Sequence, residues 1–110
     1  MQVILRDLDE PQSGYLAQDV MLITVLTSLP DRSIRVLRPL PAVVQPMSGV
    51  YMASLVDTTI SASGESLVEA VDNLKDILVA KFRLFSQKES ILGEQPRRQL
   101  CVLRRFLRAT

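Results

Sequence analysis

The side chains best placed for chemistry are three carboxylates near the start of the chain, Asp7, Asp9 and Glu10. Two neighbouring carboxyl groups can divide the roles of general acid and general base between them. The segment over residues 7–14 is, however, rich in turn-forming residues, which favours a solvated acidic loop over an active site. The serines at positions 61, 63 and 66 have no visible activating base.

The residue types that are missing narrow the chemistry further. The chain contains no histidine, the commonest general base and metal ligand at neutral pH. Its single cysteine, Cys101, lies between Leu100 and Val102, where we expect a buried and inert thiol. No cysteine pair or calcium-loop spacing occurs, and the isolated glycines form no phosphate-binding loop. We therefore predict a protein without catalytic residues, metal or cofactor.

Charge is unevenly distributed although the net charge is only +1. Residues 1–80 include 5 basic and 10 acidic residues, whereas residues 81–110 include 8 basic and 2 acidic ones. This asymmetry indicates either a surface for nucleic acid or an acidic partner, or two parts of one fold that complement each other. The candidate basic surface consists of Arg97, Arg98, Arg104, Arg105 and Arg108.

These arginines are predicted to lie on a helix over residues 96–108, with Pro96 in its first turn. The apolar side of this helix carries Leu100, Leu103 and Phe106–Leu107. Phe106 is the one aromatic residue of the stretch and falls on that apolar side, so bases have no platform on which to stack. The favoured interpretation is a surface helix whose arginines pair with acidic neighbours or lie in solvent.

Apolar segments before residue 66 predict short strands. They cover residues 2–6, one or two strands within residues 15–26, and residues 33–44, 50–56 and 57–63, with a hairpin turn over residues 46–49. Pro39 and Pro41 each remove a main-chain donor, so the strand over residues 33–44 should lie at a sheet edge or begin after Pro41. The edge over residues 37–44 could pair with its copy, giving a homo-oligomer.

The clearest element is a helix that begins after Ser66. Ser66 and Glu69 match a capping box, in which the hydroxyl accepts from the Glu69 N–H and the carboxylate reaches back to Ser66. The apolar stripe of this helix consists of Leu67, Val71, Leu74, Leu78, Phe82 and Phe85. The predicted fold is α+β, a small antiparallel β-sheet packed against one long helix with an additional C-terminal helix. It forms one domain over residues 1–110, with residues 1–32 as an N-terminal extension and residues 96–110 as a basic C-terminal helix.

Three motifs between residues 37 and 85 occur in a recognisable order. Gly49 precedes a strand of the form Y-x-A-x-L at residues 51–55, and Gly64-Glu65-Ser66 leads through Glu69-Ala70 into the helix. Asn73-Leu74-Lys75 follows one turn later. In this order and spacing the stretch resembles the core of HicB-like antitoxins. The motif positions, which we interpret as structural, are Tyr51, Gly64, Ser66, Glu69, Ala70 and Asn73.

The resemblance implies a three-stranded antiparallel sheet on a helix, and a partner. HicB-like domains commonly neutralise a small RNA-cleaving toxin by covering its active surface, and a basic toxin would suit the acidic residues 1–80. The chain departs from the family at residues 56–60, where Val-Asp-Thr-Thr-Ile replaces the usual PDLPGC stretch. The residues after Phe85 are too few for the separate DNA-binding region that many members carry.

We therefore expect a HicB-like, non-catalytic binding protein that acts as an antitoxin. The alternatives are a nucleic-acid-binding or regulatory protein that uses the arginine-rich C-terminal helix, and a homo-oligomeric protein of another function. No apolar run approaches the roughly 18 residues that a membrane span requires. The first residues lack a basic region followed by a long apolar core, so we expect a cytoplasmic protein.

Overall fold

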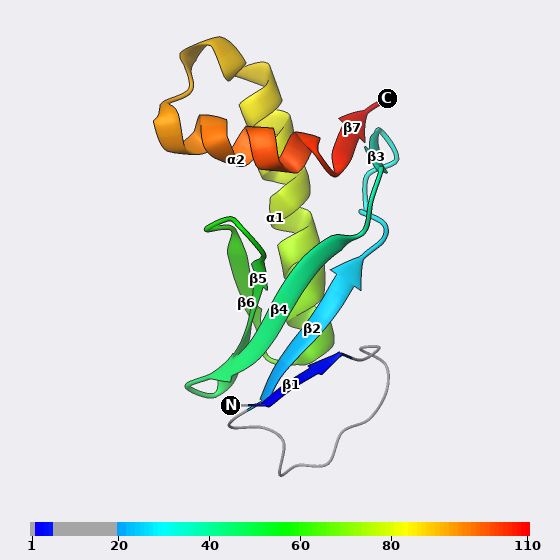
Figure 1. Ribbon diagram of the computed structural model, residues 1–110, viewed down its shortest axis with the longest axis vertical. Helices are drawn as coiled ribbons and strands as arrows, with labels where there is room; N and C mark the ends of the chain where they lie inside the picture. Colours follow the sequence, from blue (N-terminus) through cyan, green and yellow to red (C-terminus); the bar gives the residue numbers. More distant parts are fainter. Residues whose placement is uncertain (1, 6–19) are drawn as a thin grey trace.

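The computed structural model describes residues 2–5 and 20–110. Figure 1 shows a twisted sheet with one long helix lying along it and a second helix crossing the far end of the first. The elements, in chain order, are β1 (Gln2–Leu5), β2 (Val20–Leu26), β3 (Ile34–Val36), β4 (Leu40–Met47), β5 (Val50–Leu55), β6 (Ser61–Gly64), α1 (Leu67–Gln87), the 3₁₀ turn η2 (Glu89–Ile91), α2 (Glu94–Arg104) and β7 (Leu107–Ala109).

The main sheet has the strand order β1-β2-β4-β5-β6. β1 pairs in parallel with β2, and the other four strands form an antiparallel sheet that packs against α1. β3 and β7 form a separate antiparallel pair. The predicted α+β class, with a sheet on one long helix and a second C-terminal helix, is confirmed. β2 lies within residues 1–32 and pairs with β4, so this part of the predicted extension belongs to the sheet.

The core lies between the sheet and α1. Alternate residues of the strands point toward the helix, because successive side chains of a strand face opposite sides of the sheet. Leu40, Ala42 and Val44 of β4 are buried on that side. The whole predicted stripe of α1 belongs to the same core, with Leu67 half-buried and the other five residues buried. Leu100 and Leu103 of α2 and Leu107 of β7 extend the same core toward the C-terminus.

The proline-containing strand neither lies at an edge nor begins after Pro41, since β4 begins at Leu40. β4 is an interior strand with β2 on one side and β5 on the other, so it has no free edge for pairing with its own copy. Pro41 stands one residue before the first β4–β5 pair, and its carbonyl accepts from the Val56 N–H at 3.1 Å. The Pro41 nitrogen, which carries no hydrogen, therefore points past the end of β5. Pro46 faces the other way, beyond the last β2–β4 pair at Leu22 and Val44. Each proline thus occupies a position where no ladder bond is lost.

Three other predicted strand boundaries change. The strand expected over residues 33–44 is divided into β3 and β4 by a bend at residues 37 and 38. The hairpin turn narrows to Ser48 and Gly49, with φ of 49° and 87°, as a two-residue turn of the primed type requires. The strand expected over residues 57–63 begins only at Ser61. Before it, Thr58 closes a turn by donating from its hydroxyl to the Leu55 carbonyl at 3.0 Å and accepting from the Ile60 N–H at 3.0 Å.

The N-terminus of α1 is capped as predicted on one side and differently on the other. The Ser66 hydroxyl accepts from the Glu69 N–H at 3.1 Å. The Glu69 carboxylate, however, accepts from the Glu65 N–H at 3.1 Å and not from Ser66. The reach is one residue longer than in a capping box, so the carboxylate also holds the turn that leads out of β6.

The N-terminal predictions can be followed only in part. A strand is confirmed at Gln2–Leu5, and the predicted strand within residues 15–26 is confirmed for Val20–Leu26. Residues 15–19 and the acidic loop with Asp7, Asp9 and Glu10 lie outside the described residues. Within the described parts of the chain, no helix has the length and apolar character needed to cross a membrane.

Candidate basic interface

The final helix ends sooner than the sequence predicts, and this relocates two of the five candidate arginines. α2 stops at Arg104, and the chain then forms β7. The Leu100–Leu103–Leu107 spacing suggested one continuous helix, but Leu107 reaches the core from a strand. Arg105 is the residue that follows the helix, and Arg108 is the middle residue of β7.

β7 pairs with β3 in an antiparallel ribbon, and this places Arg35 directly opposite Arg108. Hydrogen bonds continue the register at both ends, from the Leu37 N–H to the Phe106 carbonyl at 2.6 Å and from the Thr110 N–H to the Ser33 carbonyl at 2.7 Å. Arg38 and Arg105 therefore lie just beyond the last of these bonds, Arg38 in the bend after β3 and Arg105 in the turn between α2 and β7. We call Arg35, Arg38, Arg105 and Arg108 the ribbon arginines.

All four ribbon arginines are exposed. Among the residues that the structure describes, none of them makes an ion pair or a side-chain hydrogen bond, in contrast to the arginines of α1 and α2. Like charges placed directly opposite each other on two strands repel and weaken the pairing. The ribbon is held from its other side, where Ile34 and Leu107 are buried in the core and Val36 packs against it.

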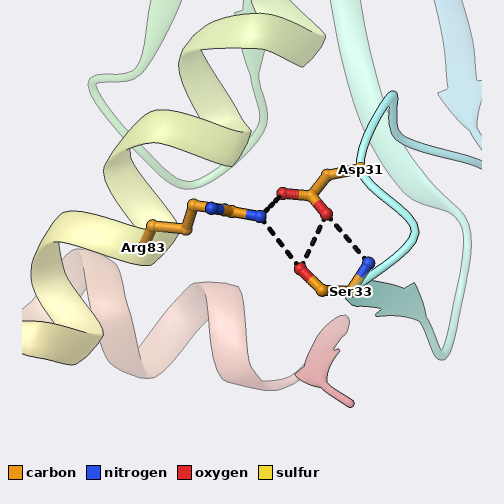
Figure 2. A network of polar contacts seen from close by, with 3 residues as sticks. All are labelled: Asp31, Ser33 and Arg83. Carbon is orange, nitrogen blue, oxygen red and sulfur yellow. Dashed lines mark hydrogen bonds and ion pairs between the residues drawn. The ribbon is translucent and has the colours of Figure 1, made fainter.

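A polar network anchors the start of the ribbon to α1 (Figure 2). The Asp31 carboxylate accepts from the Ser33 N–H at 2.8 Å and from the Ser33 hydroxyl at 2.6 Å. Arg83 of α1 forms an ion pair with the other oxygen of Asp31 and donates to the Ser33 hydroxyl at 3.0 Å. The two bonds from Ser33, more than the contacts with Arg83, lower the pKa of Asp31 below its ordinary value. Because Ser33 also pairs with Thr110, the network fixes where the ribbon begins.

The other three candidate arginines are engaged within the C-terminal helices. Arg104 makes a bidentate contact with the Glu89 carboxylate, with distances of 2.7 and 2.8 Å. This contact lowers the pKa of Glu89 and raises that of Arg104. Arg98 pairs with Glu94 one turn earlier on α2, and Arg97 donates to the Leu92 carbonyl at 3.1 Å. For Arg98 and Arg104, pairing with acidic neighbours is confirmed.

Sequence reasoning missed Arg35 and Arg38. The alternation Ile34-Arg35-Val36 is a signal of a half-buried strand, but three residues are too few to identify its partner. The partner strand is β7, most of which lies within the residues that were predicted to be helical. Cys101 is a second correction, because its thiol is exposed and not buried. It lies beside the stripe of Leu100 and Leu103 on α2 and not on it.

Acidic side chains are exposed along the first half of α1. Glu65 is exposed just before the helix, Asp72 in its second turn and Asp76 at its middle, while the ribbon and α2 lie near its C-terminal end (Figure 1). None of these three carboxylates has an ion-pair partner among the described residues. Asp72 and Asp76 are four residues apart, so they share one helix face.

A shallow hollow of about 590 Å³ lies between the turn at residues 57–59 and α2. It is lined by polar side chains, and Gln99 of α2 donates to the Thr59 hydroxyl across it. Its charged residues include Glu94 and Arg98, which neutralise each other. Within the described residues, no group of three or more cysteine, aspartate or glutamate side chains is arranged to hold a metal ion.

The six motif positions meet at the junction between β6 and α1. Tyr51 is the cross-strand partner of Gly64, and a side chain at Gly64 would collide with the main chain of Glu69 and Ala70. Ser66 caps the helix, Ala70 is fully buried, and Asn73 donates to the Ser63 carbonyl at 2.8 Å. Each position has a structural task in this corner of the fold.

Comparison of the chain with models of protein families, with curated proteins and with solved structures finds no match.

Proposed function

We propose that the protein is a non-catalytic binding protein that engages nucleic acid through the ribbon arginines. The observation that carries the proposal is the direct opposition of Arg35 and Arg108, with Arg38 and Arg105 immediately beyond them. Two opposed guanidinium groups repel in the free protein, whereas a phosphate between them is attracted to both. Guanidinium groups also match the geometry of phosphate oxygens and bind them through paired hydrogen bonds.

The arrangement favours a chain of phosphates over a single small anion. Arg35 and Arg108 lie on an exposed two-stranded ribbon, and Arg38 and Arg105 lie just beyond one end of it, so the four side chains are spaced along the surface and not gathered in one place. A spaced set of cations is complementary to the regularly spaced charges of a nucleic-acid backbone. Among the described residues, no aromatic side chain is exposed beside them, since Phe106 packs against the core. Binding should therefore depend on phosphates and show little sequence preference.

Titration with labelled nucleic acid tests this proposal. The probes are a short single-stranded RNA and a duplex DNA, followed by fluorescence anisotropy at increasing salt concentration. We expect binding that weakens steeply with salt. The double variant Arg35→Gln/Arg108→Gln should lose on the order of tenfold or more in affinity, and its salt slope should fall by about 1 for each arginine removed.

The matched control is Arg97→Gln/Arg98→Gln, which removes the same charge from α2. This control should retain most of the affinity, because Arg97 and Arg98 already contact the protein itself. Equal losses in the two double variants would contradict a ribbon site and indicate general attraction by net charge. Absence of binding to both probes at low salt would contradict the proposal as a whole.

A second candidate is the HicB-like one, neutralisation of a small basic toxin. The observation that favours it is the exposed acidic surface of Glu65, Asp72 and Asp76, which has no cationic partner among the described residues. Co-expression with neighbouring reading frames and purification at moderate salt tests it. Co-purification of a small basic protein that stops growth when expressed alone, and its loss in Asp72→Asn/Asp76→Asn, would support this candidate. Recovery of the chain without such a protein would contradict it.

A further inference from the structure

One edge of the main sheet is formed by β6. It is the last strand of the order β1-β2-β4-β5-β6, and no described strand pairs with its other side (Figure 1). The Leu55 N–H donates to the Ile60 carbonyl at 2.9 Å, and hydrogen-bonded pairs alternate with non-bonded pairs along an antiparallel ladder. The main-chain groups of Ser61 and Ser63 therefore point away from β5. They form a row of donors and acceptors that another strand can join.

Three of the four main-chain groups in this row are open. The Ser63 carbonyl accepts from the Asn73 amide at 2.8 Å, whereas the Ser61 N–H, the Ser61 carbonyl and the Ser63 N–H make no hydrogen bond with the described residues. Lysine, proline or a bulge usually protects an edge strand from further pairing. β6 is short, but its sequence Ser-Ala-Ser-Gly contains neither of these residues, and its register with β5 is unbroken. The edge therefore remains open near Ser61.

A hollow of about 520 Å³ lies beside this edge, between β6 and α1. Its lining includes Met52 of β5, Ser61 and Ser63 of β6, and Asn73, Asp76 and Ile77 of α1. Met52 is the cross-strand partner of Ser63, and it lies on the face of the sheet that points away from α1, because its neighbour Ala53 is buried on the α1 side. A strand added to β6 would therefore have α1 on one face and Met52 on the other.

We infer that the β6 edge binds an extended segment of a partner protein as an additional strand, with basic and apolar side chains at alternate positions. A row of open main-chain groups is complementary to another extended main chain, and addition of a strand to a sheet edge is a recurring mode of peptide recognition. Side chains on one face of the segment meet α1, where Asp76 is the one charged residue among those described that line the hollow. Those on the other face meet Met52, whose side chain adapts readily to an apolar partner.

Charge favours a basic segment over a second copy of this chain. Asp57 and Glu65 stand before and after β6, and both are exposed and without an ion-pair partner among the described residues. Two copies paired antiparallel through β6 would bring the Asp57 end of one beside the Glu65 end of the other. A basic side chain is attracted instead, and its stem can pack on the half-buried Ile77 while its charge reaches Asp76. The inference does not rest on nucleic-acid binding, because β6 and the β3–β7 ribbon belong to different sheets.

Nuclear magnetic resonance titration of the isotope-labelled protein tests the inference. The probe is a short peptide of alternating lysine and valine with blocked ends, at about 0.15 M salt so that distant charges are screened. We expect the amide signals of Ser61 and Ser63 to shift most. The Kd should be on the order of 0.1–1 mM, because few main-chain groups and one carboxylate are available. The same peptide methylated on its main-chain nitrogens keeps its side chains and charge but cannot join a strand ladder, and it should not bind.

Three variants, checked for folding by circular dichroism, locate the site. Ser61→Pro removes an outward N–H without loss of a ladder bond, and it should weaken binding on the order of tenfold. Asp76→Lys should weaken binding on the order of fivefold. Asp72→Lys makes the same change of charge one turn earlier, beside a separate hollow at residues 28–30, and should change binding by less than about twofold.

Three outcomes would overturn the inference. The first is that the Ser61 and Ser63 signals do not shift at about 5 mM peptide. The second is that the methylated peptide binds as well as the unmethylated one, and the third is that Asp72→Lys and Asp76→Lys weaken binding equally.

Discussion

The side-chain amide of Asn73 in α1 donates a hydrogen bond to the main-chain carbonyl of Ser63 in β6, at 2.8 Å. β6 is an edge strand of the main sheet, and the main-chain groups of Ser63 face away from β5. The bond therefore satisfies an acceptor that the sheet leaves unpaired, and it joins the edge to the helix. It also partly blocks the addition of another strand at this edge.

Replacement of Asn73 by alanine should cost about 1 kcal/mol of unfolding free energy, the usual net value of one hydrogen bond. Chemical denaturation measures it. Gln87→Ala is a suitable control, because Gln87 is exposed in the last turn of α1 and makes no side-chain hydrogen bond among the described residues. A similar loss in both variants would mean that the bond to Ser63 contributes nothing.

Gly64→Ala should destabilise the fold by about 1–3 kcal/mol, since there is no room for a methyl group. The new Cβ would lie 2.8 Å from the Glu69 carbonyl carbon and even closer to the Ala70 nitrogen, and both are main-chain atoms that cannot rotate away. Gly93→Ala provides the comparison, because a Cβ at Gly93 meets nothing within 4 Å. Gly93→Ala should change the free energy of unfolding by no more than about 0.5 kcal/mol. Alanine restricts the unfolded chain, which stabilises the fold, but it is a poorer N-cap than glycine, which destabilises it. Equal melting temperatures for the two variants would contradict the close approach at Gly64.

Arg35→Glu should stabilise the protein while weakening its binding of nucleic acid. The substitution converts a repulsive cross-strand pair with Arg108 into an attractive one, a change of about 0.2–1 kcal/mol. Thermal unfolding and anisotropy, measured on the same sample, should move in opposite directions. Arg32→Glu makes the same change of charge outside the ribbon pairs and should not raise the stability. A stability gain in both variants would show that the gain comes from the change in net charge and not from the cross-strand pair.

Acid should loosen the Asp31 network and the Glu89–Arg104 contact. Both carboxyl groups have a lower pKa in the folded protein than in the unfolded chain. Their stabilisation is therefore complete above the unfolded values, near pH 4, and is lost as the pH falls through the folded ones. The difference in melting temperature between the wild type and Asp31→Asn should be largest at neutral pH and shrink below about pH 4. A difference that does not change with pH would exclude Asp31 as the titrating group.

Local patterns predicted the centre of the fold well. The stripe of α1 and its Ser66 cap depend on residues a few positions apart, and both were confirmed. The hairpin between β4 and β5 was recognisable for the same reason. The edge assignment for β4 failed because the effect of a proline depends on where the neighbouring strand ends, and Pro41 stands beside the end of β5.

The candidate site was predictable only in part. Arg105 and Arg108 were identified as basic surface residues, but Arg35, the cross-strand partner of Arg108, comes from a distant part of the sequence. In a strand of three residues the alternation of buried and exposed side chains is too short to recognise. The helical spacing of Leu100, Leu103 and Leu107 therefore decided the prediction. Arg98 pairs with Glu94, one turn earlier on α2, and Arg104 pairs with Glu89 in η2, which precedes α2.

The β3–β7 ribbon also bears on how the protein folds and opens. It joins residues from nearly opposite ends of the stretch over residues 20–110, so its closure costs more chain entropy than that of the β4–β5 hairpin. We expect it to form after the main sheet and to exchange its amide hydrogens faster, as a separate cooperative unit. The surface with the ribbon arginines would then be a late-assembled part of the molecule, able to come apart while the sheet and α1 stay folded.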